Sequence, residues 1–170
     1  MELKSILAGL EGLKVRGKLD IDIKEIKSNS KDVKENDMFV AIKGFDVNGH
    51  EHIDEAIKNG AKAILAQEDE FNNINIKEIP EDIVLILTKN TRYALAIASC
   101  NFYNNPSKKM KLIGVTGTKG KTTTTYMIRD ILKKKGIKVG LIGTVATYVG
   151  DKKIANNENT TPESLKLQEI

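Results

Sequence analysis

The stretch Val115-Thr116-Gly117-Thr118-Lys119-Gly120-Lys121-Thr122-Thr123 decides the fold class of this 170-residue chain. It lies between a predicted strand, residues 111–115, and a predicted helix, residues 121–135. Its glycines let the backbone approach an anion closely, and the N–H groups at a helix start favour negative charge. The stretch is therefore predicted to be a phosphate-binding loop, with Lys121 on the β- and γ-phosphates and Thr122 on Mg²⁺.

The loop is a variant of the strict pattern G-x-x-x-x-G-K-[ST], because Val115 occupies the position of the first glycine. A turn rich in Gly and Thr that binds nothing is the alternative interpretation. The strand–loop–helix context and the run G-K-T-T both favour the binding loop. The candidate nucleotide-binding residues are Gly117, Thr118, Lys119, Gly120, Lys121, Thr122 and Thr123.

The residues around the loop predict the beginning of a nucleotide-binding domain. Together with a strand over residues 138–142, the strand and helix that flank the loop form one βαβ unit, which implies a parallel sheet with a right-handed crossover. Residues 161–164 predict the start of another helix, with Pro162 in its first turn. Two or three strands are too few to cover the faces of such a sheet. We therefore expect the chain to be a piece of a longer protein.

The residues before the loop predict a separate α/β module. Apolar periodicity predicts helices over residues 3–10, 52–59 and 91–103. Short apolar runs predict strands over residues 21–26, 37–42, 62–66 and 83–87. Asn90 is a suitable N-cap for the third helix, and the run Asn104-Asn105-Pro106-Ser107 breaks the chain. We therefore expect an α/β fold: a small N-terminal domain over residues 1–106, then the start of a P-loop, parallel-sheet domain over 107–170.

The composition excludes several classes of protein. Apolar residues make up 40% and charged residues 29% of the chain, as in ordinary soluble globular proteins. The longest apolar runs, such as Ile83 to Leu87, are far shorter than the roughly 20 residues that cross a bilayer, and the first residues lack a signal-peptide pattern. A single cysteine, Cys100, excludes an internal disulfide. We expect a cytoplasmic protein with no membrane insertion.

The positive charge is concentrated around the loop. Residues 107–138 contain ten Lys or Arg and one acidic residue, a net charge of +9, whereas the whole chain carries +4. Such a basic block implies an anionic partner. Nucleic acid is not the expected partner, because no aromatic residues alternate with the lysines to stack on bases. Lys133 to Lys135, at the end of the predicted helix, are expected to form a solvated face.

The motifs together resemble a known family. The run G-T-K-G-K-T-T-T is similar to the ATP loop of the Mur ligases, in which Asn is usual where this chain has Lys119. Other segments resemble the MurE type, which acts on UDP-N-acetylmuramoyl-dipeptide. These are Ser28–Lys31 with Asp37–Ala41, the segment 44–50 with Ala56 and Gly60-Ala61, and Gly143-Thr144 with residues 158–162. Asn29 and Lys31 stand where Asp and Arg are common in the family.

The resemblance implies a function for the protein. It implies a bacterial, ATP- and Mg²⁺-dependent ligase that adds a diamino acid, diaminopimelate or lysine, to UDP-N-acetylmuramoyl-L-alanyl-D-glutamate through an acyl phosphate. This is a step of peptidoglycan precursor synthesis. The first domain would bind the UDP-N-acetylmuramoyl group. A carbamylated lysine and an amino-acid-binding domain would lie beyond Ile170, so the 170 residues alone would be inactive, and the full-length enzyme would be a monomer.

The resemblance also assigns roles to individual residues. Lys121 would be catalytic, Thr122 would bind Mg²⁺, and Ser30 would contact the UDP group. Asn159, Thr160 and Thr161 would bind the muramoyl-peptide side of the substrate.

Structural roles stand as alternatives to several of these assignments. Ser30 would merely cap a turn, and Thr161 would be the N-cap of the last helix. His50 and His52 are expected to be structural or surface residues. Two other functions remain open: a related ligase of the MurF type, and a non-catalytic module that binds a UDP-sugar or a nucleotide.

Overall fold

The computed structural model divides the chain into two compact units, Met1–Pro106 and Ser107–Ile170. It describes residues 1–44, 47–72, 79–155 and 160–170. Within these residues no helix combines the length and the apolar character that crossing a membrane requires.

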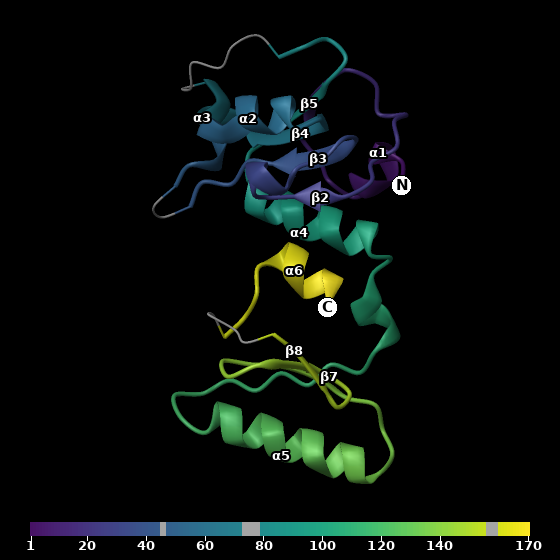
Figure 1. Cartoon of the computed structure of the whole chain (residues 1–170), viewed down its shortest axis with the longest axis vertical. Coiled ribbons are helices and arrows are strands. Elements are labelled where there is room, and N and C mark those ends of the chain that lie inside the picture. The colour runs from purple at the N-terminus through teal and green to yellow at the C-terminus, as the bar shows by residue number, and fades with distance from the viewer. Residues whose placement is uncertain (45–46, 73–78, 156–159) are drawn as a thin grey trace. The chain divides into compact units, whose positions relative to one another are not determined.

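The first unit is built on a mixed five-stranded sheet in the order β1-β5-β4-β3-β2 (Figure 1). Its strands are β1 (Lys14–Arg16), β2 (Ile26–Lys27), β3 (Asp37–Val40), β4 (Ala61–Gln67) and β5 (Val84–Thr88). Strands β2 to β5 are parallel to one another, and β1 pairs antiparallel with β5. Its helices are α1 (Leu3–Ile6), α2 (Ile53–Lys58), α3 (Glu68–Asn72) and α4 (Thr91–Phe102).

The core of this unit follows from the alternation of side chains along the strands. Phe39 of β3 and Ile64 of β4 lie in one buried cluster with Ile53 and Ala56 of α2. The alternate residues, among them Met38 and Leu65, are also fully buried, as expected for parallel strands covered on both faces. Helix α4 lies on the other side of the sheet from α2 (Figure 1). The apolar runs were therefore correctly interpreted as buried strands.

Helix α4 confirms the predicted N-cap. The backbone N–H of Tyr93 donates to Asn90 Oδ1 at 3.0 Å, which satisfies one of the free N–H groups of the first turn. Helix α2 likewise matches its prediction.

Two predictions for the first unit are wrong in extent. The helix expected over residues 3–10 ends at Ile6, and the chain then turns through Gly9, which has a φ of +81°. The strand expected over residues 21–26 forms only at Ile26–Lys27, because the preceding residues hydrogen-bond to the N-terminal segment instead, for example Leu3 N–H to Ile21 O at 2.8 Å.

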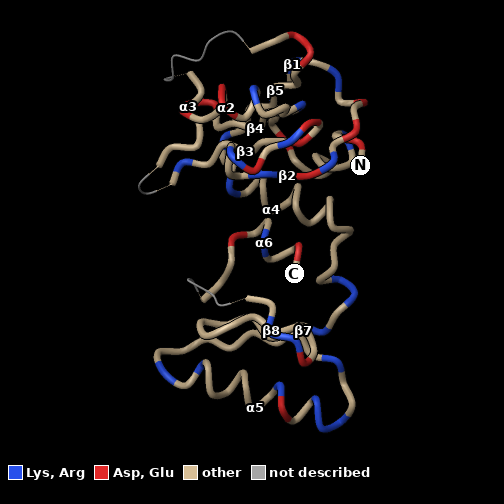
Figure 2. Tube along the Cα trace, viewed as in Figure 1, with Lys and Arg blue, Asp and Glu red and all other residues tan. Residues whose placement is uncertain are grey.

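The second unit contains one long helix, α5 (Lys121–Lys134), beside a three-stranded sheet (Figure 1). The strands are β6 (Gly140–Ile142), β7 (Thr147–Val149) and β8 (Lys152–Ala155), and both pairings are antiparallel. A short helix, α6 (Ser164–Glu169), follows. The basic residues that are concentrated in residues 107–138 lie along this unit, before the loop and on α5 (Figure 2).

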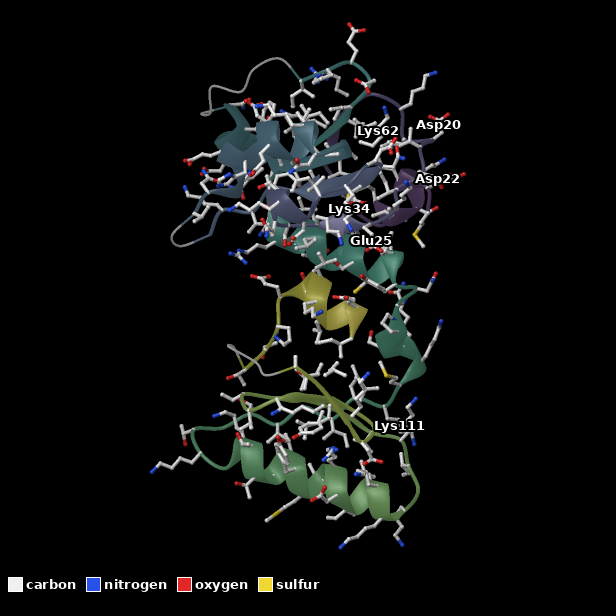
Figure 3. All side chains as sticks on the ribbon, in the orientation of Figure 1. Asp20, Asp22, Glu25, Lys34, Lys62 and Lys111 are labelled. Carbon is white, nitrogen blue, oxygen red and sulfur yellow. The ribbon has the colours of Figure 1, made fainter. Side chains whose placement is uncertain are left out.

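The α/β class is confirmed, but the parallel βαβ pairing expected in the second unit does not form. Residues 111–115 are not in a strand, and Leu112 and Ile113 are 71% and 61% exposed. Strand β6 pairs instead with β7, which follows it directly in sequence. The β6–β7 hairpin supplies the hydrogen bonds of one edge of β6 at a smaller entropy cost than a distant partner would. Lys111, labelled in Figure 3, lies in this extended segment that leads to the loop.

The last helix begins later than predicted. Its first residue is Ser164 and its N-cap is Glu163, so Thr161 is not the N-cap and Pro162 lies outside the helix. The interpretation of Thr161 as a capping residue is therefore wrong.

Candidate active site

The predicted phosphate loop lies at the N-terminus of α5. Gly120 is the N-cap of this helix and has a φ of +79°, in the left-handed region. A side chain at this position would strain the backbone, although a Cβ there would meet no atom within 4 Å. Gly120 is therefore required for its conformation, which turns the chain from the loop into the helix.

The N-terminus of α5 is open to an anion. Among the described residues, no side chain caps its first turn, in contrast to α4, where Asn90 occupies that position. The first N–H groups of a helix have no partner within the helix, and the helix dipole makes this end electropositive. Thr122, the predicted Mg²⁺ ligand, is exposed in the first turn. This geometry suits the phosphates of a nucleotide.

Lys121 reaches back over the loop. Its Nζ donates to the backbone carbonyl of Gly117 at 2.6 Å, so the ammonium group spans the loop. A phosphate bound there would replace the Gly117 carbonyl as the acceptor of this group. The remaining candidate residues, Thr118, Lys119 and Thr123, are exposed.

Ser30 lies in the first unit, at the start of the 3-10 turn Ser30–Asp32, and is 5% exposed. Its hydroxyl donates to Glu55 Oε2 on α2, and its carbonyl accepts from Asn59 Nδ2 at 2.9 Å. The turn is capped by Asn29, whose side chain accepts from Lys31 N–H at 3.2 Å. Ser30 therefore does not act as the cap itself, and its contact with UDP stays a prediction.

Thr144 and Thr160, which belong to the two segments of one family motif, contact each other in the second unit. The hydroxyls of Thr144 and Thr160 lie 3.0 Å apart, within hydrogen-bond distance. Thr161 follows, and both Thr160 and Thr161 are exposed. Asn159, the third predicted substrate-binding residue, lies outside the described residues.

His50 has a structural role, as predicted. It is fully buried, and its Nδ1 lies 2.8 Å from Asn48 Oδ1, while its Nε2 accepts the backbone N–H of Gln67 at 2.9 Å. These contacts require a neutral ring with its proton on Nδ1. Burial is the main cause that lowers the pKa of His50, opposed by the negative charge of Glu70. His50 thus ties the chain after β3 to the end of β4.

The His50 geometry predicts a pH-dependent stability. Because its pKa is lower in the folded protein than the ordinary 6.5, the unfolded state binds more protons at mildly acidic pH. The stabilisation is complete above pH ~6.5 and decreases as the pH falls below this value. We expect the free energy of unfolding to decrease from pH 7.5 to 5.5 by less in His50→Ala than in the wild type. Urea unfolding at the two pH values measures this, and equal decreases would contradict the prediction.

The sequence analysis missed a cluster in the second unit. Arg129 of α5 is 9% exposed and lies over the ring of Tyr148 on β7, and Lys133 forms an ion pair with Asp151. Lys133 is therefore not part of a purely solvated face. The spacing of Arg129 and Lys133 on one helix face is visible in the sequence, but their partners are not.

The described residues contain no group of three or more His, Cys, Asp or Glu that could hold a metal ion. Thr122, exposed in the first turn of α5, is the loop residue predicted to bind Mg²⁺, a cation that takes oxygen ligands.

Comparison with known families agrees with the two-part organisation. Residues 22–103 match the Mur ligase family, catalytic domain, and residues 115–170 match the Mur ligase middle domain. The loop and Thr160 lie in the second match, and Ser30 and His50 lie in the first. The chain belongs to the Mur ligase family.

The relatives are more specific. The chain is 48% identical over all of its 170 residues to a UDP-N-acetylmuramoyl-L-alanyl-D-glutamate--2,6-diaminopimelate ligase of Clostridium tetani, of which it covers 34%. It is 44% identical over the same length to the corresponding ligase of Clostridium perfringens. The chain thus spans about a third of the length of the curated relatives it matches.

A solved structure shows the same fold. A UDP-N-acetylmuramoyl-L-alanyl-D-glutamate--2,6-diaminopimelate ligase aligns with 99% of this chain and 32% of its own, with a TM-score of 0.70 and 17% identity. At this identity the similarity concerns the fold alone.

Proposed function

We propose that the protein containing this chain is an ATP-dependent ligase that joins diaminopimelate to UDP-N-acetylmuramoyl-L-alanyl-D-glutamate. The observation that carries the proposal is identity of 48% over the whole chain to a ligase named for that reaction. The open N-terminus of α5 and the position of Lys121 over the loop support the nucleotide part of the proposal. Between the two diamino acids considered from the sequence, the relatives favour diaminopimelate.

In this proposal the loop binds the phosphates of ATP. The N–H groups at the start of α5 and the Lys121 ammonium hold and neutralise them, and the Thr122 hydroxyl is a ligand of Mg²⁺. Magnesium-ATP supplies the phosphoryl group that activates the terminal carboxylate of the UDP-dipeptide as an acyl phosphate. The residues of this chain act by positioning and charge neutralisation, which dominate the catalysis of phosphoryl transfer.

The first unit is proposed to bind the UDP-N-acetylmuramoyl part of the substrate. To contact UDP through its hydroxyl, Ser30 would keep its hydrogen bond to Glu55 and use a lone pair of its oxygen as an acceptor. Thr160 and Thr161 are proposed to bind the peptide side, with Asn159 beside them. Thr160 is held by Thr144 within the same unit.

A substrate-choice experiment tests the proposal. The whole protein is incubated with magnesium-ATP and one of two acceptors, the UDP-dipeptide or the UDP-tripeptide, each with diaminopimelate, lysine or D-alanyl-D-alanine. We expect a product only from the UDP-dipeptide, with diaminopimelate preferred to lysine, as measured by mass spectrometry. A product only from the UDP-tripeptide and D-alanyl-D-alanine would assign the protein to the MurF type. Nucleotide and UDP-sugar binding without any product would favour the non-catalytic module.

A further inference from the structure

Arg129 joins α5 to the β7–β8 hairpin of the second unit. Its guanidinium carbon lies 4.3 Å from the centroid of the Tyr148 ring on β7. Its Nη2 donates to the carbonyl of Gly150, in the turn between β7 and β8, at 3.0 Å. Its Nε is buried and has no hydrogen-bond partner among the described residues. Arg129 is also the buried residue of α5.

Residues one turn away on each side extend this contact. The ring of Tyr126 meets that of Tyr148 edge to face, with centroids 6.1 Å apart and an angle of 85°. Lys133 forms an ion pair with Asp151 in the β7–β8 turn. The spacing of residues 126, 129 and 133 places them on one face of the helix. Helix α5 therefore meets the β7–β8 hairpin through an aromatic and cationic stripe.

Among the apolar residues of α5, Ile128 and Leu132, the sequence neighbours of Arg129 and Lys133, are half-buried. Met127 and Ile131, four residues apart on another face, are each 61% exposed. Apolar packing is nondirectional. A planar guanidinium group that donates to a carbonyl and stacks on a ring instead fixes the distance and the angle between the helix and the hairpin. Arg129 thus adds a contact of defined distance and direction between α5 and the hairpin.

This contact bears on the candidate active site because α5 begins at Lys121. Arg129 lies eight positions after Lys121, about 12 Å along the helix axis, so Arg129 does not reach a nucleotide in the loop. A tilt of the helix at Arg129 would nevertheless redirect the N–H groups at its start.

We propose that Arg129 is a positioning residue of the nucleotide site, which orients α5 and with it Lys121 and the loop against the β7–β8 hairpin. The inference rests on the proposed function, since it assumes that the loop binds ATP. It predicts that nucleotide affinity depends on the directional contacts of Arg129 and not only on its volume.

The test uses the whole ligase with Arg129→Met, which keeps the long side chain and removes the fork. We expect the dissociation constant for ADP, measured by calorimetry, and the KM for ATP to rise about tenfold. The KM for the UDP-dipeptide should stay unchanged. Arg129→Lys, which retains a cation near the Tyr148 ring, should recover part of the affinity. The matched control is Lys134→Met, because Lys134 is exposed on the same helix, and it should bind ADP as the wild type does.

Stability separates positioning from a purely structural role. A lower unfolding midpoint in Arg129→Met with an unchanged ADP dissociation constant would overturn the inference. If that variant does not fold, Tyr148→Leu removes the ring under the guanidinium and must weaken ADP binding in the same direction; unchanged affinity there would also overturn it. Failure of the wild type itself to bind ADP would contradict the proposed function instead.

Discussion

Replacing Lys121 with alanine in the whole protein is expected to lower the kcat of the proposed ligation by about 10²–10³-fold, the usual effect of removing one group that stabilises transition-state charge. The Lys121 ammonium already spans the loop, bonded to the Gly117 carbonyl. The side chain of Lys121 is half-buried at the start of α5 and outside the cluster of buried residues, so its loss should leave the fold intact. The rate of phosphate release in the presence of the UDP-dipeptide and diaminopimelate measures the effect.

The matched control for this prediction is Lys111→Ala. Lys111 is exposed and precedes the loop (Figure 3), so this variant removes the same charge from the same unit without touching α5. Its kcat should stay within about twofold of the wild type, because exposed charges more than a Debye length of about 8–10 Å from a site are largely screened. Retention of wild-type turnover by Lys121→Ala would remove Lys121 from the catalytic machinery.

Replacing Phe39 with alanine is expected to destabilise the first unit by about 3–5 kcal/mol, the usual cost of deleting a buried aromatic side chain. Phe39 is 1% exposed and belongs to the cluster that joins β3 and β4 to α2. The cavity left behind would be enclosed by the sheet and this helix. Urea unfolding followed by circular dichroism measures the free energy of unfolding.

Tyr93→Ala provides the aromatic control, because Tyr93 is 59% exposed on α4. This variant should change the free energy of unfolding by less than about 1 kcal/mol, as is usual for surface substitutions. If Phe39→Ala were no more destabilising than Tyr93→Ala, the buried contact between β3 and α2 would not exist in the protein. The proposed UDP-sugar site would then lose its structural basis, because Ser30 is bonded to Glu55 on α2.

Patterns that depend on local chemistry were predictable from the sequence. The helix after the loop is confirmed over Lys121–Lys134, because the glycine at its start and Gly136 after its end both act locally. Helix α4 is confirmed for the same reason, since the side chain of Asn90 caps its first turn by accepting the N–H of Tyr93. The buried strands β3, β4 and β5 were predictable because each contains a continuous apolar run.

Elements that depend on distant partners were not predictable. Strand β1 is exposed at all three of its positions, so it carries no apolar alternation, and only its pairing with β5 makes it a strand. Residues 111–115 have the apolar pattern of a strand, yet none forms there. Hydrogen bonds between strands, which no single segment contains, decide both cases.

The candidate site shows the same difference between local signals, which the sequence contains, and distant partners, which it does not. The loop sequence predicts Lys121 and the start of α5 as the nucleotide site, because the candidate residues lie within seven consecutive positions. The partners of Ser30 and Arg129 lie 25 and 21 residues away in sequence. A buried arginine is also contrary to the usual preference of charged side chains for the surface, so no pattern in the sequence indicated it.

The measurement that tests the central claim most directly follows an oxygen atom. The UDP-dipeptide is prepared with a heavy oxygen isotope in its terminal carboxylate and incubated with the whole protein, magnesium-ATP and diaminopimelate. Ligation through an acyl phosphate predicts that the released phosphate carries heavy oxygen from that carboxylate, since the carboxylate oxygen leaves with the phosphoryl group when the amine attacks. Amide product accompanied by unlabelled phosphate would contradict the account.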